Sequence, residues 1–328
     1  MVRPTLWWRK DLVVLQQALT LDQPQLLLMY ERFDYFNDWI APSVKANLEL
    51  NCEVNDINWS SDPLELSCAD GRLWTAKHVI ITTSIKLLQE NDINFTPDLP
   101  NETRLAIDEY IMMDGLKVFM SFEERFYREA WEIDAEYTIG DSTLFFYNAA
   151  YGQTTNANVL GMIAVGEPAA KYVNMVDEEI INAILAELDA LYDGQATSNY
   201  IDGHVQNWNQ QVFVRGAYSY LSDDDEAYES IPTLRKPLGN KLFFAGEAVP
   251  ADLENGFAHG AALSGRAAAK SAQALLDDDA TEQAPNATQK NRSAPSSSTP
   301  SSPSSAATQT AMTKVYLFGF IFCLLALM

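Results

Sequence analysis

Apolar residues recur along this chain with two periods, and these periods predict where helices and strands lie. Residues 177–192 carry apolar side chains at helical spacing and predict an amphipathic helix, through Ile180, Ile181, Ile184, Leu185, Leu188 and Leu191. Residues 103–110 also fit a helix. Alternation over 117–122 predicts a strand, and the short apolar run 242–245 predicts a buried strand. Residues 260–276, rich in Ala and Ser, predict a closely packed helix.

The pattern changes past residue 276. Ser, Thr, Pro, Ala and Asn dominate 277–314, and such a composition buries too little apolar surface to fold, so we expect a disordered stalk. The run 315–328 is a hydrophobic tail, shorter than the roughly 20 residues that span a bilayer as a helix. Small residues at 304–306 and a polar spacer ending at Lys314 precede it, which fits a signal for a GPI anchor. A tail-anchored membrane helix is the alternative.

Acceptor triplets for N-glycosylation agree with a secretory route to the cell surface and a membrane-associated glycoprotein. They begin at Asn58, Asn94, Asn101, Asn286 and Asn291. The first residues, however, lead into no signal peptide. We therefore expect the N-terminus of this chain to be incomplete.

Composition limits the remaining possibilities. The 328 residues, 47% of them hydrophobic, suffice for a two-lobed unit with a sizeable core, and a formal charge of −23 disfavours nucleic acid as a partner. That charge favours a cationic substrate or high solubility.

Cys52 and Cys68 can approach each other across a predicted hairpin, but we interpret them as small buried residues. His78, His204 and His259 lack ligand spacing, so no metal site is expected.

The most informative motif runs through residues 242–247 (LFFAGE) and 256–266 (GFAHGAALSGR). Glycine lets a backbone approach a ligand closely, and the N–H groups of a helix N-terminus stabilise phosphate. Three more stretches stand in order before it: 48–83, 115–122 (GLKVFMSF) and 208–220 (WNQQVFVRGAYSY). Together these segments resemble the FAD-dependent amine oxidases, which comprise monoamine oxidases, polyamine oxidases and lysine-specific histone demethylases.

The resemblance implies a mixed α/β, two-lobed amine oxidase fold. No G-x-G sequence occurs in the chain, so the N-terminal Rossmann βαβ unit is expected to be missing by truncation. The implied domains are 1–47, partial helices of the substrate domain; 48–86, the returning part of the FAD-binding domain; 87–220, the substrate-binding domain; 221–276, the C-terminal part of the FAD-binding domain; 277–314, the stalk; and 315–328, the tail.

The resemblance also assigns roles to residues. Lys117 is an ammonium in an apolar strand, which is costly unless it is compensated, and the alternative is a lysine on the solvent side of an edge strand. By resemblance it is the active-site lysine, with a lowered pKa, that holds a water at flavin N5. Tyr218 matches the aromatic that aligns the amine beside the flavin, with a core tyrosine as the alternative. Met162 matches a strand that lines the substrate cavity, with a plain core methionine as the alternative.

Cofactor contacts follow from the same resemblance. The backbone of Val54 matches the adenine contact and Glu247 the carboxylate near the ribityl–phosphate segment. The other cofactor-binding residues implied are Trp208, Gly246, Gly256, Phe257 and Ala258. Ala217 occupies the position of the cysteine that binds flavin covalently in monoamine oxidases, so FAD is expected to be noncovalent. Residues 253–254 replace the second aromatic of the family's cage.

The implied reaction is oxidation of an amine, a polyamine first of all. The amine loses hydride to flavin N5, the imine hydrolyses to an aldehyde, and oxygen regenerates FAD with release of hydrogen peroxide. The alternative is a catalytically inactive amine-oxidase remnant that acts as a membrane-anchored binding or structural protein.

Overall fold

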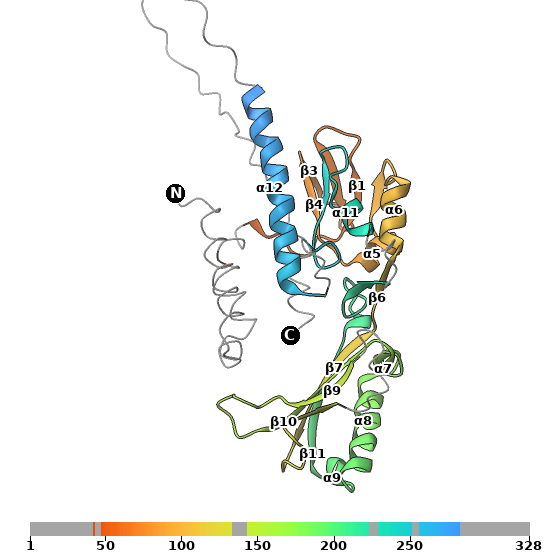
Figure 1. The fold of residues 1–328 in the computed structure, drawn as a ribbon, viewed down its shortest axis with the longest axis vertical. Coiled ribbons are helices and arrows are strands. Elements are labelled where there is room, and N and C mark those ends of the chain that lie inside the picture. Colours follow the sequence, from red (N-terminus) through yellow and green to blue (C-terminus); the bar gives the residue numbers. More distant parts are fainter. Residues whose placement is uncertain (1–41, 43–46, 133–142, 223–228, 251–255, 283–328) are drawn as a thin grey trace, which may run out of the picture. The chain divides into compact units, whose positions relative to one another are not determined.

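The computed structural model describes residues 42, 47–132, 143–222, 229–250 and 256–282. They divide into two compact units (Figure 1). We call Met112–Ser219 the central unit, and Asn51–Ile111 together with the residues from Tyr220 onward the flanking unit. The chain crosses between them within β6 (Tyr110–Met112) and β12 (Ser219–Leu221), which pair as a two-stranded sheet.

The central unit is built on one five-stranded sheet of order β11-β7-β10-β9-β8, in which every neighbouring pair is antiparallel. Its strands are β7 (Gly115–Phe122), β8 (Ala130–Glu132), β9 (Thr143–Asn148), β10 (Asn158–Val165) and β11 (Tyr200–Asn207). Its helices are α7 (Glu167–Ala170), α8 (Asp177–Leu191) and α9 (Gln195–Asn199).

Helix α8 covers one face of this sheet (Figure 1). Its apolar stripe is buried with the even-numbered residues of β7 in one core, through Ile180, Ile184, Leu188, Leu116, Val118 and Met120. Three acidic residues in its first turn stabilise the helix, because their negative charges lie at the positive end of the helix dipole. The helix and the strand predicted for 177–192 and 117–122 are therefore both present.

The flanking unit has a four-stranded sheet of order β3-β2-β1-β5 and a separate parallel pair. The sheet contains β1 (Val54–Asn58), β2 (Leu64–Cys68), β3 (Leu73–Ala76) and β5 (Asn94–Thr96), and the pair is β4 (Val79–Ile81) with β13 (Leu242–Phe244). The helices are α5 (Ile85–Gln89), α6 (Asn101–Asp108), α11 (Ser230–Arg235) and α12 (Ala258–Glu282). Small residues of α12, among them Ala272, pack on Ile80 and Phe243 of the parallel pair, as the Ala- and Ser-rich sequence predicts.

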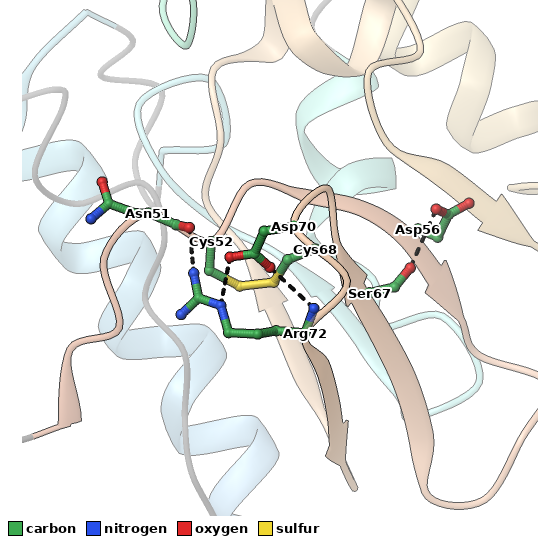
Figure 2. Close-up of a disulfide and its surroundings, with 7 residues drawn as sticks. All are labelled: Asn51, Cys52, Asp56, Ser67, Cys68, Asp70 and Arg72. Carbon is green, nitrogen blue, oxygen red and sulfur yellow. Dashed lines mark hydrogen bonds and ion pairs between the residues drawn. A yellow bond between two sulfur atoms is a disulfide. The ribbon is translucent and has the colours of Figure 1, made fainter.

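Cys52 and Cys68 form a disulfide, with Cα atoms 5.3 Å apart (Figure 2). Our interpretation of both as unlinked buried residues was wrong. The β1–β2 hairpin pairs Val54 with Cys68 and so brings the two sulfur atoms together. Arg72 stabilises the same hairpin. Its Nε lies 2.7 Å from the Asp70 carboxylate, and its guanidinium also donates to the backbone carbonyl of Asn51 (Figure 2).

Some predicted boundaries differ from those observed. Helix α6 ends at Asp108, and Tyr110 already belongs to β6. Helix α12 continues past residue 276 to Glu282, where the stalk was expected, and Gln273 donates to Asp277 one turn later at 2.9 Å. Residues 87–111, expected in the substrate-binding domain, pack with the flanking unit.

Most of 1–47 and all of 283–328 lie outside the described residues. None of the described helices is long and apolar enough to cross a membrane.

Candidate functional site

Lys117 lies near the start of β7, a strand that is hydrogen-bonded on both sides. Its register partners are Ile163 of β10 and Gln206 of β11. The residue is only 8% exposed. Because β7 is an inner strand of the sheet, the alternative of a lysine at a solvent-facing edge does not apply. An ammonium in this place needs compensating interactions.

The indole of Trp208 supplies one such interaction. Lys117 Nζ lies 5.8 Å from the centroid of the Trp208 ring, within the range of a cation–π contact. Trp208 is buried and opens the 3-10 turn η4 (Trp208–Gln210), which follows β11 directly. A Cβ on Gly115 would lie 3.5 Å from Trp208 Cε3. Gly115 precedes Lys117 by two residues and so shares its face of the strand, which leaves room for the indole beside the lysine.

The segment that carries Tyr218 is tied to the residues just before β7. The Met113 N–H donates to the Tyr218 carbonyl at 3.0 Å, and the Ala217 N–H donates to the Met113 carbonyl at 2.8 Å. A Cβ on Gly115 would lie 2.4 Å from Ala217 Cβ, so this glycine is required for the approach. The start of β7 thus gathers Lys117, Trp208 and the backbone of Tyr218.

Met162 does not share this face of the sheet. It pairs with Val118 of β7 and is completely buried in the core beneath α8. Directly paired residues point to the same face, and Lys117 is one position away from Val118. Met162 is therefore a core methionine on the other face of the sheet from Lys117. The residue of β10 that shares the face of Lys117 is Ile163, which is half-buried.

Two aromatic side chains that the sequence analysis missed lie on the lysine face. Phe145 pairs with Ile163, and its ring stacks on that of Tyr147 with centroids 6.0 Å apart and an interplanar angle of 13°. Tyr147 covers Gly161, and its burial raises the pKa of the phenol. The signal in the sequence was the aromatic run 143–148 (TLFFYN), which does not alternate and so could not show which rings share a face. These rings form an apolar, electron-rich surface on the same side of the sheet as Lys117.

In the flanking unit, the motif of residues 242–247 forms a tight turn at the carboxyl end of β13. Gly246 has φ +122°, a conformation that favours glycine. Its N–H donates to Ser264 Oγ of α12 at 3.2 Å, and that hydroxyl donates to the Val249 carbonyl. Glu247 accepts a hydrogen bond from the Gly256 N–H at 2.8 Å, which fixes the chain two residues before α12 begins. Gly246, Glu247 and Gly256 therefore lie together at the junction between β13 and α12.

Buried hydroxyls stand at the same end of this parallel pair. Thr82 and Thr83 directly follow β4, and among the described residues their Oγ atoms are buried without a hydrogen-bond partner. A Cβ on Gly246 would lie 3.6 Å from the Thr82 carbonyl. Ligands of α/β proteins bind at the carboxyl ends of parallel strands, and helix N-termini favour phosphate. The unsatisfied hydroxyls, the bare glycine and the start of α12 fit the polar and phosphate parts of FAD.

The remaining cofactor residues are placed as follows. Ala258 is the first residue of α12, and Phe257 before it is 57% exposed, with its ring centroid 5.3 Å from that of His259. Val54 begins β1 in the four-stranded sheet, whereas Gly246 follows β13 of the separate parallel pair. Residues 253–254 lie outside the described residues. In the described part of the chain, no group of His, Cys, Asp or Glu is arranged to hold a metal ion.

Comparison with known proteins agrees with this arrangement. A family model described as flavin containing amine oxidoreductase matches residues 32–272. Polyamine oxidase 7 of Oryza sativa subsp. japonica is 28% identical over 226 residues, 68% of this chain and 47% of that protein. Polyamine oxidase 1 of Zea mays is 28% identical over 234 residues, with 68% and 44% covered. The human lysine-specific histone demethylase 2 is 26% identical over 210 residues, 62% and 25%.

Solved structures show the same fold. Cyclohexylamine oxidase from Brevibacterium oxydans IH-35A matches with a TM-score of 0.60 and 22% identity, over 74% of this chain and 53% of that one. A putrescine oxidase bound to putrescine matches with a TM-score of 0.57 and 18% identity, over 75% and 52%. The chain spans less than half the length of the polyamine oxidases compared here. Its mixed α/β fold and the family model, which covers most of its length, show that the chain belongs to the flavin-containing amine oxidoreductases, a family whose cofactor is FAD.

Proposed function

We propose that this protein oxidises an amine, a polyamine first of all, with noncovalent FAD and oxygen, giving an imine and then an aldehyde together with hydrogen peroxide. The observation that carries the proposal is Lys117, an ammonium buried in an inner strand beside Trp208, with the Tyr218 segment tied to the start of that strand. Bound FAD supplies the redox chemistry, as acceptor of hydride at flavin N5.

The residues of the central unit orient the substrate and exclude water. The face of the sheet that carries Lys117 also carries the stacked rings of Phe145 and Tyr147. Such a surface accommodates methylene chains and attracts an ammonium through its π electrons. The net charge of −23 favours the approach of a polycation. Lys117 would hold the water that assists reoxidation, and Tyr218 would align the reacting carbon.

The flanking unit would hold the cofactor. The turn at Gly246, the hydroxyls of Thr82 and Thr83 and the N-terminus of α12 are the groups that would contact its polar and phosphate portions. Ala217 has no atom that can bond to the flavin, and its Cβ is packed against Gly115. We therefore expect denaturation to release unmodified FAD.

A peroxidase-coupled assay of the FAD-loaded protein tests this proposal. Spermine, spermidine and putrescine should each release hydrogen peroxide faster than benzylamine does. If the protein takes up FAD and shows its absorbance but oxidises none of these amines, that result would contradict the proposal. A colourless protein that binds no FAD would instead support the alternative, a membrane-anchored binding or structural remnant.

A cell-surface location through the secretory pathway also forms part of the proposal. The disulfide Cys52–Cys68 supports it, because disulfides persist in oxidising compartments. The glycosylation triplet at Asn94 lies on an exposed residue of β5. Attachment would run through the tail 315–328 or a lipid anchor added near 304–306. Mass spectrometry of the native protein from membranes distinguishes them, since only a retained tail yields peptides of 320–328.

A further inference from the structure

The side chain of Asn209 bridges the turn that carries Trp208 to the strand that carries Lys117. Asn209 Oδ1 accepts a hydrogen bond from the Gly115 N–H at 2.9 Å. The amide nitrogen of the same side chain donates to the carboxylate of Asp114. One amide therefore holds two consecutive residues at the start of β7, and a hydrogen bond to a carboxylate is stronger than one between neutral groups.

The turn itself is fixed from the other side. Asn207 caps it, since its Oδ1 accepts from the Asn209 N–H at 3.1 Å, and its buried Nδ2 donates to the Val173 carbonyl at 2.8 Å. The carbonyl of Asp114 in turn accepts from the Gly166 N–H at 2.8 Å, just after β10. The turn follows β11, whose Asn207 already pairs with Leu116 of β7, and the Asn209 side chain adds a second link at the very start of that strand.

We propose that Asn209 is a positioning residue of the amine oxidase site, which sets the distance between the Lys117 ammonium and the Trp208 indole. This inference rests on the proposed function for its catalytic meaning. Trp208 immediately precedes Asn209, and Lys117 follows Gly115 by two residues on the same face of β7. A shift of the turn therefore moves the indole relative to the ammonium directly, and it also changes the packing over Gly115.

The test measures how well Lys117 is protected in the full chain, without reference to catalysis. The rate at which an acylating reagent modifies each lysine is followed by peptide mass spectrometry, with Lys171, about half exposed, as the internal standard. Asn209→Ala should raise the rate at Lys117 about tenfold relative to Lys171, because the bridge to β7 is lost. The matched control is Asn158→Ala, which removes hydrogen bonds to the carbonyls of Phe122 and Glu123 at the far end of β7 and should leave Lys117 protected.

A charge exchange separates positioning from general folding. Asn209→Asp sets two carboxylates against each other and should expose Lys117 as Asn209→Ala does. Combining it with Asp114→Asn reverses donor and acceptor, keeps an acceptor for the Gly115 N–H, and should restore protection to within about threefold of the wild type.

Unchanged protection of Lys117 in both Asn209→Ala and Asn209→Asp would overturn the proposal, as would failure of the double variant to restore it. Equal loss of protection at all lysines in Asn209→Ala, with no recovery in the double variant, would also overturn it, because Asn209 would then act on the whole fold. Since these rates are measured without substrate, they stand even if the protein oxidises no amine. In FAD-loaded protein, Asn209→Ala should lower the rate of flavin reoxidation and leave FAD content unchanged.

Discussion

The ring of Tyr147 lies directly over Gly161, so that a Cβ added to the glycine would stand 2.4 Å from Tyr147 Cζ. The two residues belong to neighbouring strands and face each other in register. The missing side chain on β10 is what lets the phenol ring lie flat against the sheet and stack on Phe145. The aromatic surface on the lysine face therefore depends on one glycine.

Gly161→Ala should displace the Tyr147 ring and cost about 1–3 kcal/mol of the free energy of unfolding, because the neighbouring atoms must move. The measurement is urea unfolding, with near-ultraviolet circular dichroism as the report on the ring. The control is Gly265→Ala in α12, where, among the described residues, nothing beyond the neighbouring residues and backbone of the helix itself lies within 4 Å of the added Cβ. That substitution should stabilise by about 0.5–1 kcal/mol, since glycine weakens a helix interior. Equal effects of the two substitutions would contradict this account.

Lys117→Met should keep the fold and slow flavin reoxidation by oxygen about a hundredfold or more in FAD-loaded protein, because it removes the group that holds the ordered water in the proposed function. Methionine has a similar length, so the free energy of unfolding should change by less than about 1.5 kcal/mol. Stopped-flow absorbance of the flavin measures the rate. The matched control is Lys171→Met, which removes a surface ion pair with Glu187 of 2.8 Å and should leave reoxidation intact. An unaltered rate in Lys117→Met would show that the lysine has another role.

Loss of the disulfide should weaken the flanking unit. Cys52 and Cys68 are 16 residues apart in the sequence, and closing a loop of this size lowers the entropy of the unfolded chain by an amount worth about 3 kcal/mol. The double variant Cys52→Ala/Cys68→Ala should lose about that much in urea unfolding. Thiol titration of the denatured, unreduced chain is the direct check: one of the three cysteines should react. Three reactive thiols would contradict the linkage.

The central unit should lose stability at alkaline pH. Burial raises the pKa of Tyr127 to about 12, whereas an unfolded tyrosine titrates near 10. The folded state thus holds this proton more tightly, so its contribution to stability is complete below pH 10 and is lost as the pH rises toward 12. Urea midpoints at pH 9 and 11 should differ less in Tyr127→Phe than in the wild type. Tyr151→Phe, at a residue that is 60% exposed, should keep the wild-type difference.

The sequence predicted β7 and α8 because alternation and helical spacing are local properties. It did not show that Met162 and Lys117 point to opposite faces, because the face of β10 is fixed by its register with β7, and a shift of one residue would exchange the faces. The disulfide was missed because the sequence does not show how closely the hairpin register, which pairs Val54 with Cys68, brings Cys52 to Cys68. Lys117 and Trp208 were assigned through family resemblance, and the bridge by Asn209 depends on contacts between distant segments that no periodicity encodes.

The hydrogen bond between the backbones of Met113 and Tyr218 holds the two ends of the central unit side by side. The chain enters and leaves the central unit at adjacent positions, with the Met113 N–H donating to the Tyr218 carbonyl at 3.0 Å. Residues 112–219 therefore have the form of a cassette whose ends can be bridged by a short turn. A cassette of this kind can be exchanged between relatives as one piece, while the flanking unit keeps its own sequence and fold.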